Sequence, residues 1–136
     1  MPKHRRGARS APHRPPGSHS RFERLVDRAL AGIPAPFREA LAEVAIVIDD
    51  EPTAQQRREN ELADDEMLYG LYEGVPRTEY GADWSGMPNR ITLFRLPLEE
   101  DFADPAELAD EVRITVIHEL AHHLGIDDDR LDELGL

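Results

Sequence analysis

The sequence predicts an α+β fold in which a small mixed sheet packs against N-terminal helices and a long C-terminal helix. Two observations carry this prediction. Apolar residues recur at the i, i+3, i+4 spacing of a buried helix face near both ends of the chain, over 22–33 and 105–124. Between them lie three short apolar runs rich in β-branched or aromatic residues, at 44–48, 67–73 and 90–96, which are typical of strands.

Composition narrows the class of protein. The chain has 136 residues, of which 40% are hydrophobic and 32% charged, and this suits one domain with a modest core. It has no cysteine, which excludes disulfides, thiolate-bound metals and thiol catalysis. No apolar run is long enough to cross a bilayer, and a net charge of −12 argues against nucleic acid as the partner of the whole protein.

The charge is distributed unevenly. Residues 1–21 carry +6 with no acidic residue and several prolines and glycines, whereas the rest of the chain carries −18. We therefore predict a disordered basic arm over 1–21 and a folded domain over 22–136. The arm is either a solvated leader or a contact for phosphates or another anionic surface. No apolar export signal follows its arginines, so we expect a cytoplasmic protein.

The first predicted helix begins at a capping box. Ser20 and Glu23 have the spacing at which each side chain satisfies a backbone N–H of the helix start. Apolar residues continue on one face as far as Ile33, and Pro34 ends the helix. A shorter helix is expected from about Pro36.

The three apolar runs are the predicted strands. The run at 44–48 has the profile of a buried strand, and those at 67–73 and 90–96 are each followed by glycine or proline. The charged stretch 53–66 is expected to be a loop with a short helix, and 77–89 to be irregular.

The last helix has clear signals at both ends. Asp104 is a good N-cap, Pro105 suits the first helical position, and Glu107 places an acid in the first turn. Gly125 is well placed to end the helix in a left-handed conformation.

This helix carries the sequence HELAH at 118–122. His118 and His122 are four residues apart, so both imidazoles lie on one helical face and can bind a single ion. Zn²⁺ is the expected ion, because its tetrahedral shell accepts imidazole and leaves room for a third protein ligand and water. Glu119 is rotated by about 100° from His118 and can act as general base on a metal-activated water.

The third ligand has to lie close by or upstream, because only 14 residues follow His122. Gly125 breaks the helix and lets the chain turn back, and Asp128 follows three residues later. We predict Asp128 as the third ligand. Asp127 and Asp129 are alternatives, because a slip of one residue in the turn would exchange them.

A further histidine, His123, adjoins the second ligand. It is rotated by about 100° from His122 and about 140° from His118, so we expect it to face away from the metal as a partly buried residue.

Residues 22–136 resemble a family of small bacterial zincin-like metallopeptidases, the minimal metalloproteases. The resemblance lies in MLYGLYEGVP at 67–76, ITLF at 91–94 and HELAHHLGIDDDRL at 118–131. The last segment has the spacing HExxHxxGxxD, which is similar to the extended metzincin motif with an aspartate in place of the third histidine.

The resemblance implies a zincin-like fold and a peptide or protein substrate. It also implies that His118, His122 and Asp128 bind zinc and that Glu119 is the general base. The chain departs from larger metzincins because no methionine follows Asp128 to form their methionine turn. A zincin edge strand pairs with extended substrate, and 90–96 is the candidate here, with an interior strand as the alternative.

Two functions from different classes fit these observations. The first is a zinc-dependent peptidase, which the carboxylate of Glu119 favours because a structural two-histidine site does not need it. The second is a metal-stabilised, non-catalytic binding or adaptor module, which the missing methionine turn favours. The donor that would stabilise an oxyanion is left open among four residues. They are Tyr69, Tyr72, Tyr80 and Arg90.

Overall fold

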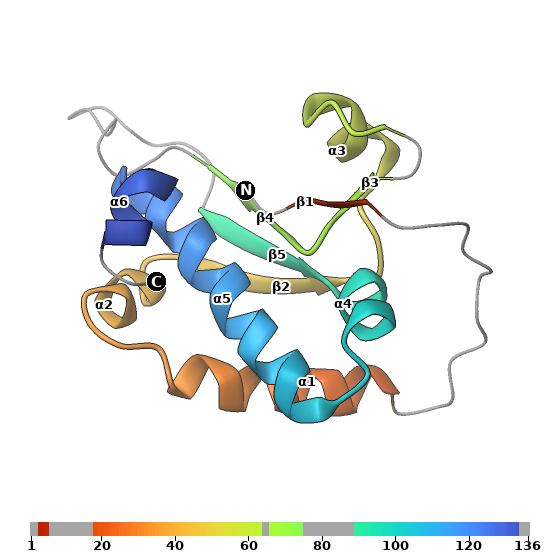
Figure 1. Ribbon diagram of the computed structural model, residues 1–136, viewed down its shortest axis with the longest axis horizontal. Helices are drawn as coiled ribbons and strands as arrows, with labels where there is room; N and C mark the ends of the chain where they lie inside the picture. Colours follow the sequence, from red (N-terminus) through yellow and green to blue (C-terminus); the bar gives the residue numbers. More distant parts are fainter. Residues whose placement is uncertain (1–2, 6–17, 64–65, 75–88, 134–136) are drawn as a thin grey trace.

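The structure is a computed structural model, and it describes residues 3–5, 18–63, 66–74 and 89–133. A three-stranded sheet lies behind the long helix α5 (Pro105–Leu124) in the view of Figure 1. Helix α1 (Ser18–Ala31) runs along the bottom of this view and packs against α5. The predicted α+β architecture is therefore confirmed. No helix among the described residues is both long and apolar enough to span a membrane.

The sheet is mixed, with the order β2-β5-β4. Strand β5 (Arg90–Phe94) is central, parallel to β2 (Ala45–Asp49) and antiparallel to β4 (Gly70–Glu73). For 90–96 the sequence left an edge strand and an interior strand open, and the structure has the interior strand, because both sides of β5 are paired. The buried profile expected for 44–48 was also wrong, because β2 is an edge strand with a half-buried centre and exposed ends.

The expected single strand at 67–73 is divided at Tyr69. Strand β3 (Glu66–Leu68) pairs instead with β1 (Lys3–Arg5), antiparallel, in a separate two-stranded sheet. β1 lies within the segment predicted as a disordered arm, and 6–17 lies outside the described residues. The domain boundary after residue 21 stays a prediction.

Helix α1 begins at Ser18, so Ser20 lies inside the helix and does not cap it. The short helix expected next is α2 (Phe37–Leu41). In the charged stretch, α3 (Ala54–Glu59) begins at a capping box formed by Thr53 and Gln56. The irregular stretch expected at 77–89 lies outside the described residues except for its last position.

Two short helices were not predicted. Helix α4 (Arg95–Asp101) follows β5 directly, and Pro97 lies in its first turn, where the missing proline N–H breaks no helical hydrogen bond. Helix α6 (Asp128–Glu133) follows the turn at Gly125 and lies beside the C-terminal end of α5 (Figure 1).

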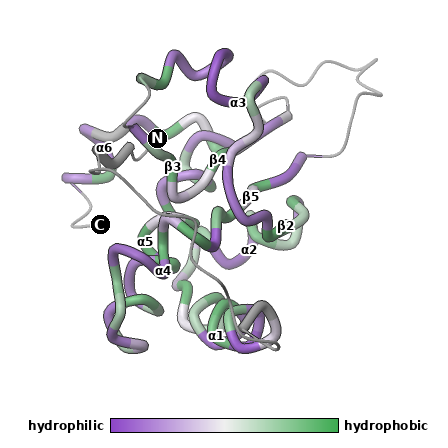
Figure 2. Tube along the Cα trace, turned by 90° about the vertical axis from the view of Figure 1, so that its right-hand side faces the viewer, coloured by the Kyte–Doolittle hydropathy of each residue, from purple (hydrophilic) through white to green (hydrophobic). Residues whose placement is uncertain are grey.

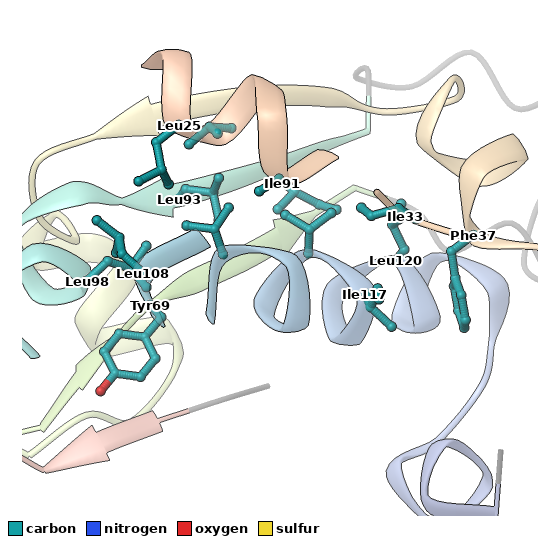
Figure 3. Close-up of a cluster of buried hydrophobic side chains, with 14 of the residues drawn as sticks. Leu25, Ile33, Phe37, Tyr69, Ile91, Leu93, Leu98, Leu108, Ile117 and Leu120 are labelled. Carbon is teal, nitrogen blue, oxygen red and sulfur yellow. The ribbon is translucent and has the colours of Figure 1, made fainter. Parts of the chain in front are cut away.

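Helix α5 has the predicted ends. The side chain of Asp104 accepts the backbone N–H groups of Ala106 and Glu107, and Gly125 closes the helix at φ 74°. Its apolar side packs against the sheet and against α1, whose turns carry both hydrophobic and hydrophilic residues (Figure 2). Most of the core residues form one cluster along α5 (Figure 3), and Leu68, Leu71 and Phe94 form a second, smaller cluster.

Candidate metal centre

Helix α5 presents two interleaved pairs of polar side chains, each with a spacing of four residues. The outer pair is His118 and His122, which are both half-buried. The inner pair is Glu119 and His123, which are both 0% exposed. The rotation of about 100° per residue places the pairs on adjacent faces, so one pair reaches solvent while the other enters the core.

The carboxylate of Glu119 is fixed between the sheet and the outer pair. Its Oε1 accepts the backbone N–H of Tyr72 over 2.8 Å and lies 3.7 Å from Nδ1 of His122. A buried carboxylate is costly unless it is hydrogen-bonded, and a backbone N–H is a strong donor to it. Glu119 therefore has a defined position beside His122.

The sheet leaves this N–H available because β4 is an edge strand of the described three-stranded sheet. Phe94 N donates to Tyr69 O over 2.9 Å, and the same register pairs Tyr72 with Ile91. Hydrogen-bonded and non-hydrogen-bonded pairs alternate in an antiparallel ladder, so the N–H of Tyr72 points away from β5. Glu119 binds a donor that the sheet does not use.

A glycine brings α5 close to this strand. A Cβ atom added to Gly70 would lie 2.6 Å from Cγ2 of Thr115, which is closer than two carbon atoms can pack. The absence of a side chain at Gly70 thus sets the separation of helix and strand one turn before Glu119.

The second inner residue, His123, also contacts Tyr72. Its Nδ1 lies 3.1 Å from the Tyr72 hydroxyl, and its Nε2 lies 2.9 Å from Oε1 of Glu43. Because an ionised carboxylate only accepts hydrogen bonds, Nε2 carries the proton that is donated to Glu43. The Tyr72 hydroxyl donates its own proton to Oδ1 of Asn89. His123 faces away from the outer pair and is more deeply buried than expected.

The predicted third ligand, Asp128, is the first residue of α6, and its side chain lies outside the described part of the chain. Among the side chains that are described, no three His, Asp or Glu residues converge on a metal-sized site. The neighbouring Asp127 accepts the backbone N–H of Arg130 over 2.9 Å, and Asp129 is exposed. The structure thus gives Asp127 a role in capping α6.

The segment after α5 returns to the core. Ile126 N donates to Ala121 O over 2.8 Å, and Leu131 on α6 is fully buried. These contacts hold the start of α6 near the C-terminal end of α5, where His122 lies.

Of the four oxyanion candidates, three lie among the described residues, and each is engaged elsewhere. The Tyr69 hydroxyl donates to Asp101 over 2.6 Å, and Arg90 forms an ion pair with Glu73 at 3.1 Å. The Tyr72 hydroxyl lies within reach of His123. Tyr80 lies outside the described residues.

Sequence reasoning missed two groups at this centre, the backbone N–H of Tyr72 and the carboxylate of Glu43. Neither leaves a local signal, since they lie 47 residues from Glu119 and 80 residues from His123 in the chain.

One carboxyl group on α5, that of Glu111, has a shifted pKa. Burial raises the pKa of Glu111, two turns before His118, above its ordinary value of 4.5. The charge of His118 acts in the opposite direction, and that of Asp110 adds to the rise.

A mixed sheet packed against a helix with two half-buried histidines four residues apart, and with a buried glutamate next to the first, defines a zincin-type domain. A family model described as "Zincin-like metallopeptidase" matches residues 41–136, which is more than half of the chain. The protein belongs to this zincin-like metallopeptidase family, and membership implies a metal and peptide substrates. A search among curated proteins found no match.

Proposed function

We propose that this protein is a zinc-dependent peptidase with Glu119 as general base and with His118, His122 and Asp128 as metal ligands. The observation that carries the proposal is the position of Glu119. Its Oε1 is held at 2.8 Å from Tyr72 N and 3.7 Å from His122 Nδ1. This is a fixed carboxylate beside a half-exposed imidazole, as general-base catalysis next to a metal requires.

The donor set fits zinc. Both imidazoles lie on one face of a rigid helix, and both reach solvent, so an ion with an open coordination position is accessible to substrate. Nδ1 of His122 faces Glu119, so its Nε2 is the nitrogen that would bind the ion. Zn²⁺ held by these residues would supply two things, polarisation of the substrate carbonyl and a lowered pKa of water at neutral pH.

Asp128 is favoured over its neighbours as the third ligand. Asp127 already accepts the N–H of Arg130, and this contact stabilises the first turn of α6. Asp129 is exposed one residue further into α6. A carboxylate oxygen at Asp128 would complete three protein ligands and leave the fourth position for water or substrate.

Glu119 has two tasks in the proposed reaction. It takes a proton from the attacking water, and it returns that proton to the leaving amine when the peptide bond breaks. Both transfers use the same carboxylate, so its fixed position serves both steps.

The test is metal content together with peptide cleavage. The purified chain is analysed by mass spectrometry beside Asp128→Ala, with Asp129→Ala as the matched control. We expect one zinc per chain in the wild type and in Asp129→Ala, and a large loss in Asp128→Ala. Cleavage of a peptide library that stops on chelation and returns with zinc would support the peptidase.

Other outcomes have distinct meanings. Full zinc in Asp128→Ala would overturn the assignment of that ligand. A zinc-loaded chain that unfolds on chelation and cleaves no peptide would overturn the peptidase in favour of a metal-stabilised binding module.

A further inference from the structure

Tyr72 contacts α5 through two separate groups. Its backbone N–H donates to Glu119, and its phenol lies 3.1 Å from Nδ1 of His123, with the two rings 5.7 Å apart. Glu119 and His123 are the two members of the inner pair, one helical turn apart. A single residue of β4 is therefore bound to both ends of one turn of α5.

The Tyr72 phenol belongs to a larger network of contacts. Its oxygen also lies 3.0 Å from Oδ1 of Asn89, the residue just before β5. On the far side of His123, Nε2 bonds to Glu43 in the loop between α2 and β2. This chain of contacts joins four separate segments of the protein at the Tyr72 side chain.

We propose that Tyr72 is a positioning residue for Glu119, and that His123 and Glu43 act through it. The phenol network fixes the path of β4 at Tyr72, and this path aims the backbone N–H at Oε1 of Glu119. Without the network, the edge strand keeps its ladder to β5 on one side only, and its outward N–H groups lose a fixed direction. The inference rests on the proposed function, because the positioned group is the proposed general base.

Glu43 is the best place to test this idea. Its side chain is 44% exposed, so its removal leaves no buried cavity, and it contacts neither Glu119 nor the outer histidines in any described interaction. Glu43→Ala removes the acceptor of His123 Nε2. Glu43→Gln keeps an acceptor oxygen at the same position and is the conservative rescue.

The second test variant is Tyr72→Phe, for which Tyr69→Phe is a matched control. The Tyr69 hydroxyl also makes an internal hydrogen bond, to Asp101, but Tyr69 lies beside Leu98 and Leu108, at the other end of the core cluster from Phe37 (Figure 3). Loss of either phenol removes an internal hydrogen bond. Only Tyr72→Phe disturbs the segment that holds Glu119.

The first measurement is hydrogen exchange of the residue 72 amide by NMR in the metal-free, full-length protein. A hydrogen bond to a charged group slows exchange by about tenfold or more. We expect that protection in the wild type, Glu43→Gln and Tyr69→Phe, and its loss in Glu43→Ala and Tyr72→Phe. Unchanged protection in both of the last two variants would overturn the proposal, whatever the activity.

The second measurement is peptide hydrolysis by the zinc-loaded protein. Misplacement of a reacting group by a fraction of an ångström reduces kcat by roughly ten- to a hundredfold. We expect this loss in Glu43→Ala, with KM and zinc content unchanged, and recovery in Glu43→Gln. Lost protection with a normal kcat would overturn the positioning role. A wild type with a protected amide but no turnover would overturn the peptidase assignment alone.

Discussion

Glu119 and Tyr72 are 47 residues apart in the chain, and the carboxylate Oε1 of one accepts the backbone N–H of the other over 2.8 Å. This contact joins the helix that carries the histidines to the open edge of the sheet. It uses a donor that no strand of the described sheet pairs with, and it gives a hydrogen bond to a carboxylate that is fully buried. The contact therefore serves folding and the proposed chemistry together.

Replacement of the proposed base should separate catalysis from metal binding. In Glu119→Gln the amide oxygen can still accept the Tyr72 N–H, so fold and zinc content are expected to be kept. Peptide hydrolysis should fall by about 10²- to 10⁴-fold, the usual contribution of a general base. Turnover and zinc are measured on the same samples. Activity close to wild type would exclude Glu119 as the base.

Gly70 should not tolerate a side chain. The added Cβ of Gly70→Ala would lie 2.6 Å from Cγ2 of Thr115, so either the Thr115 side chain or the packing of α5 on β4 must shift. Overpacking of this kind costs about 1–3 kcal/mol, and we expect such a loss in the free energy of unfolding by urea denaturation.

The matched control for this prediction is Gly32→Ala after α1. Its nearest contact would be an ordinary 3.6 Å to Ala29 O, and we expect no loss or a gain of about 0.5 kcal/mol. Equal free energies of unfolding for the two variants would show that Gly70 does not determine the separation between α5 and β4.

The long helix α5 could be predicted almost to the residue, because Asp104 and Gly125 are local signals that act on their own segment. The sheet was harder. The residues on both sides of Tyr69 favour a strand, so the sequence predicts one strand there. The division arises because Glu66–Leu68 pairs with β1, which lies far away in the chain. Likewise, which strand forms the edge depends on long-range pairing that no local pattern encodes.

The candidate centre shows the same division. The spacing of His118 and His122 sets their shared face through helical geometry alone, and the sequence predicted it. The same helical rotation explains why Glu119 and His123 point inward. Their hydrogen-bond partners cannot be predicted in this way, because Tyr72 and Glu43 reach α5 only through tertiary packing.

Thr115 offers a change that should not destabilise the protein. Its Oγ1 is buried and has no hydrogen-bond partner among the described residues. Thr115→Val replaces this hydroxyl by a methyl group of similar shape, so we expect the free energy of unfolding to stay equal or to rise by about 1 kcal/mol. Thr115→Ala, which leaves a cavity, should lower it. A clear loss in the valine variant, measured by urea denaturation, would mean that the hydroxyl is bonded.

The raised pKa of Glu111 predicts a specific pH dependence of stability. Burial makes the folded protein bind this proton more tightly than the unfolded chain does. The associated stability is fully present below the ordinary pKa of 4.5 and is lost as the pH rises through the higher folded value. Metal-free wild type should therefore show a stability loss in the interval just above pH 4.5 that Glu111→Gln lacks.

Urea denaturation at a series of pH values measures this difference. The gap between Glu111→Gln and wild type should widen in favour of the variant as the pH rises, and then become constant once the folded carboxyl has ionised. Glu107, exposed in the first turn of the same helix, provides the control, since Glu107→Gln keeps the loss that Glu111 causes. A gap that narrows with rising pH would mean that the attraction to His118 outweighs the burial of Glu111.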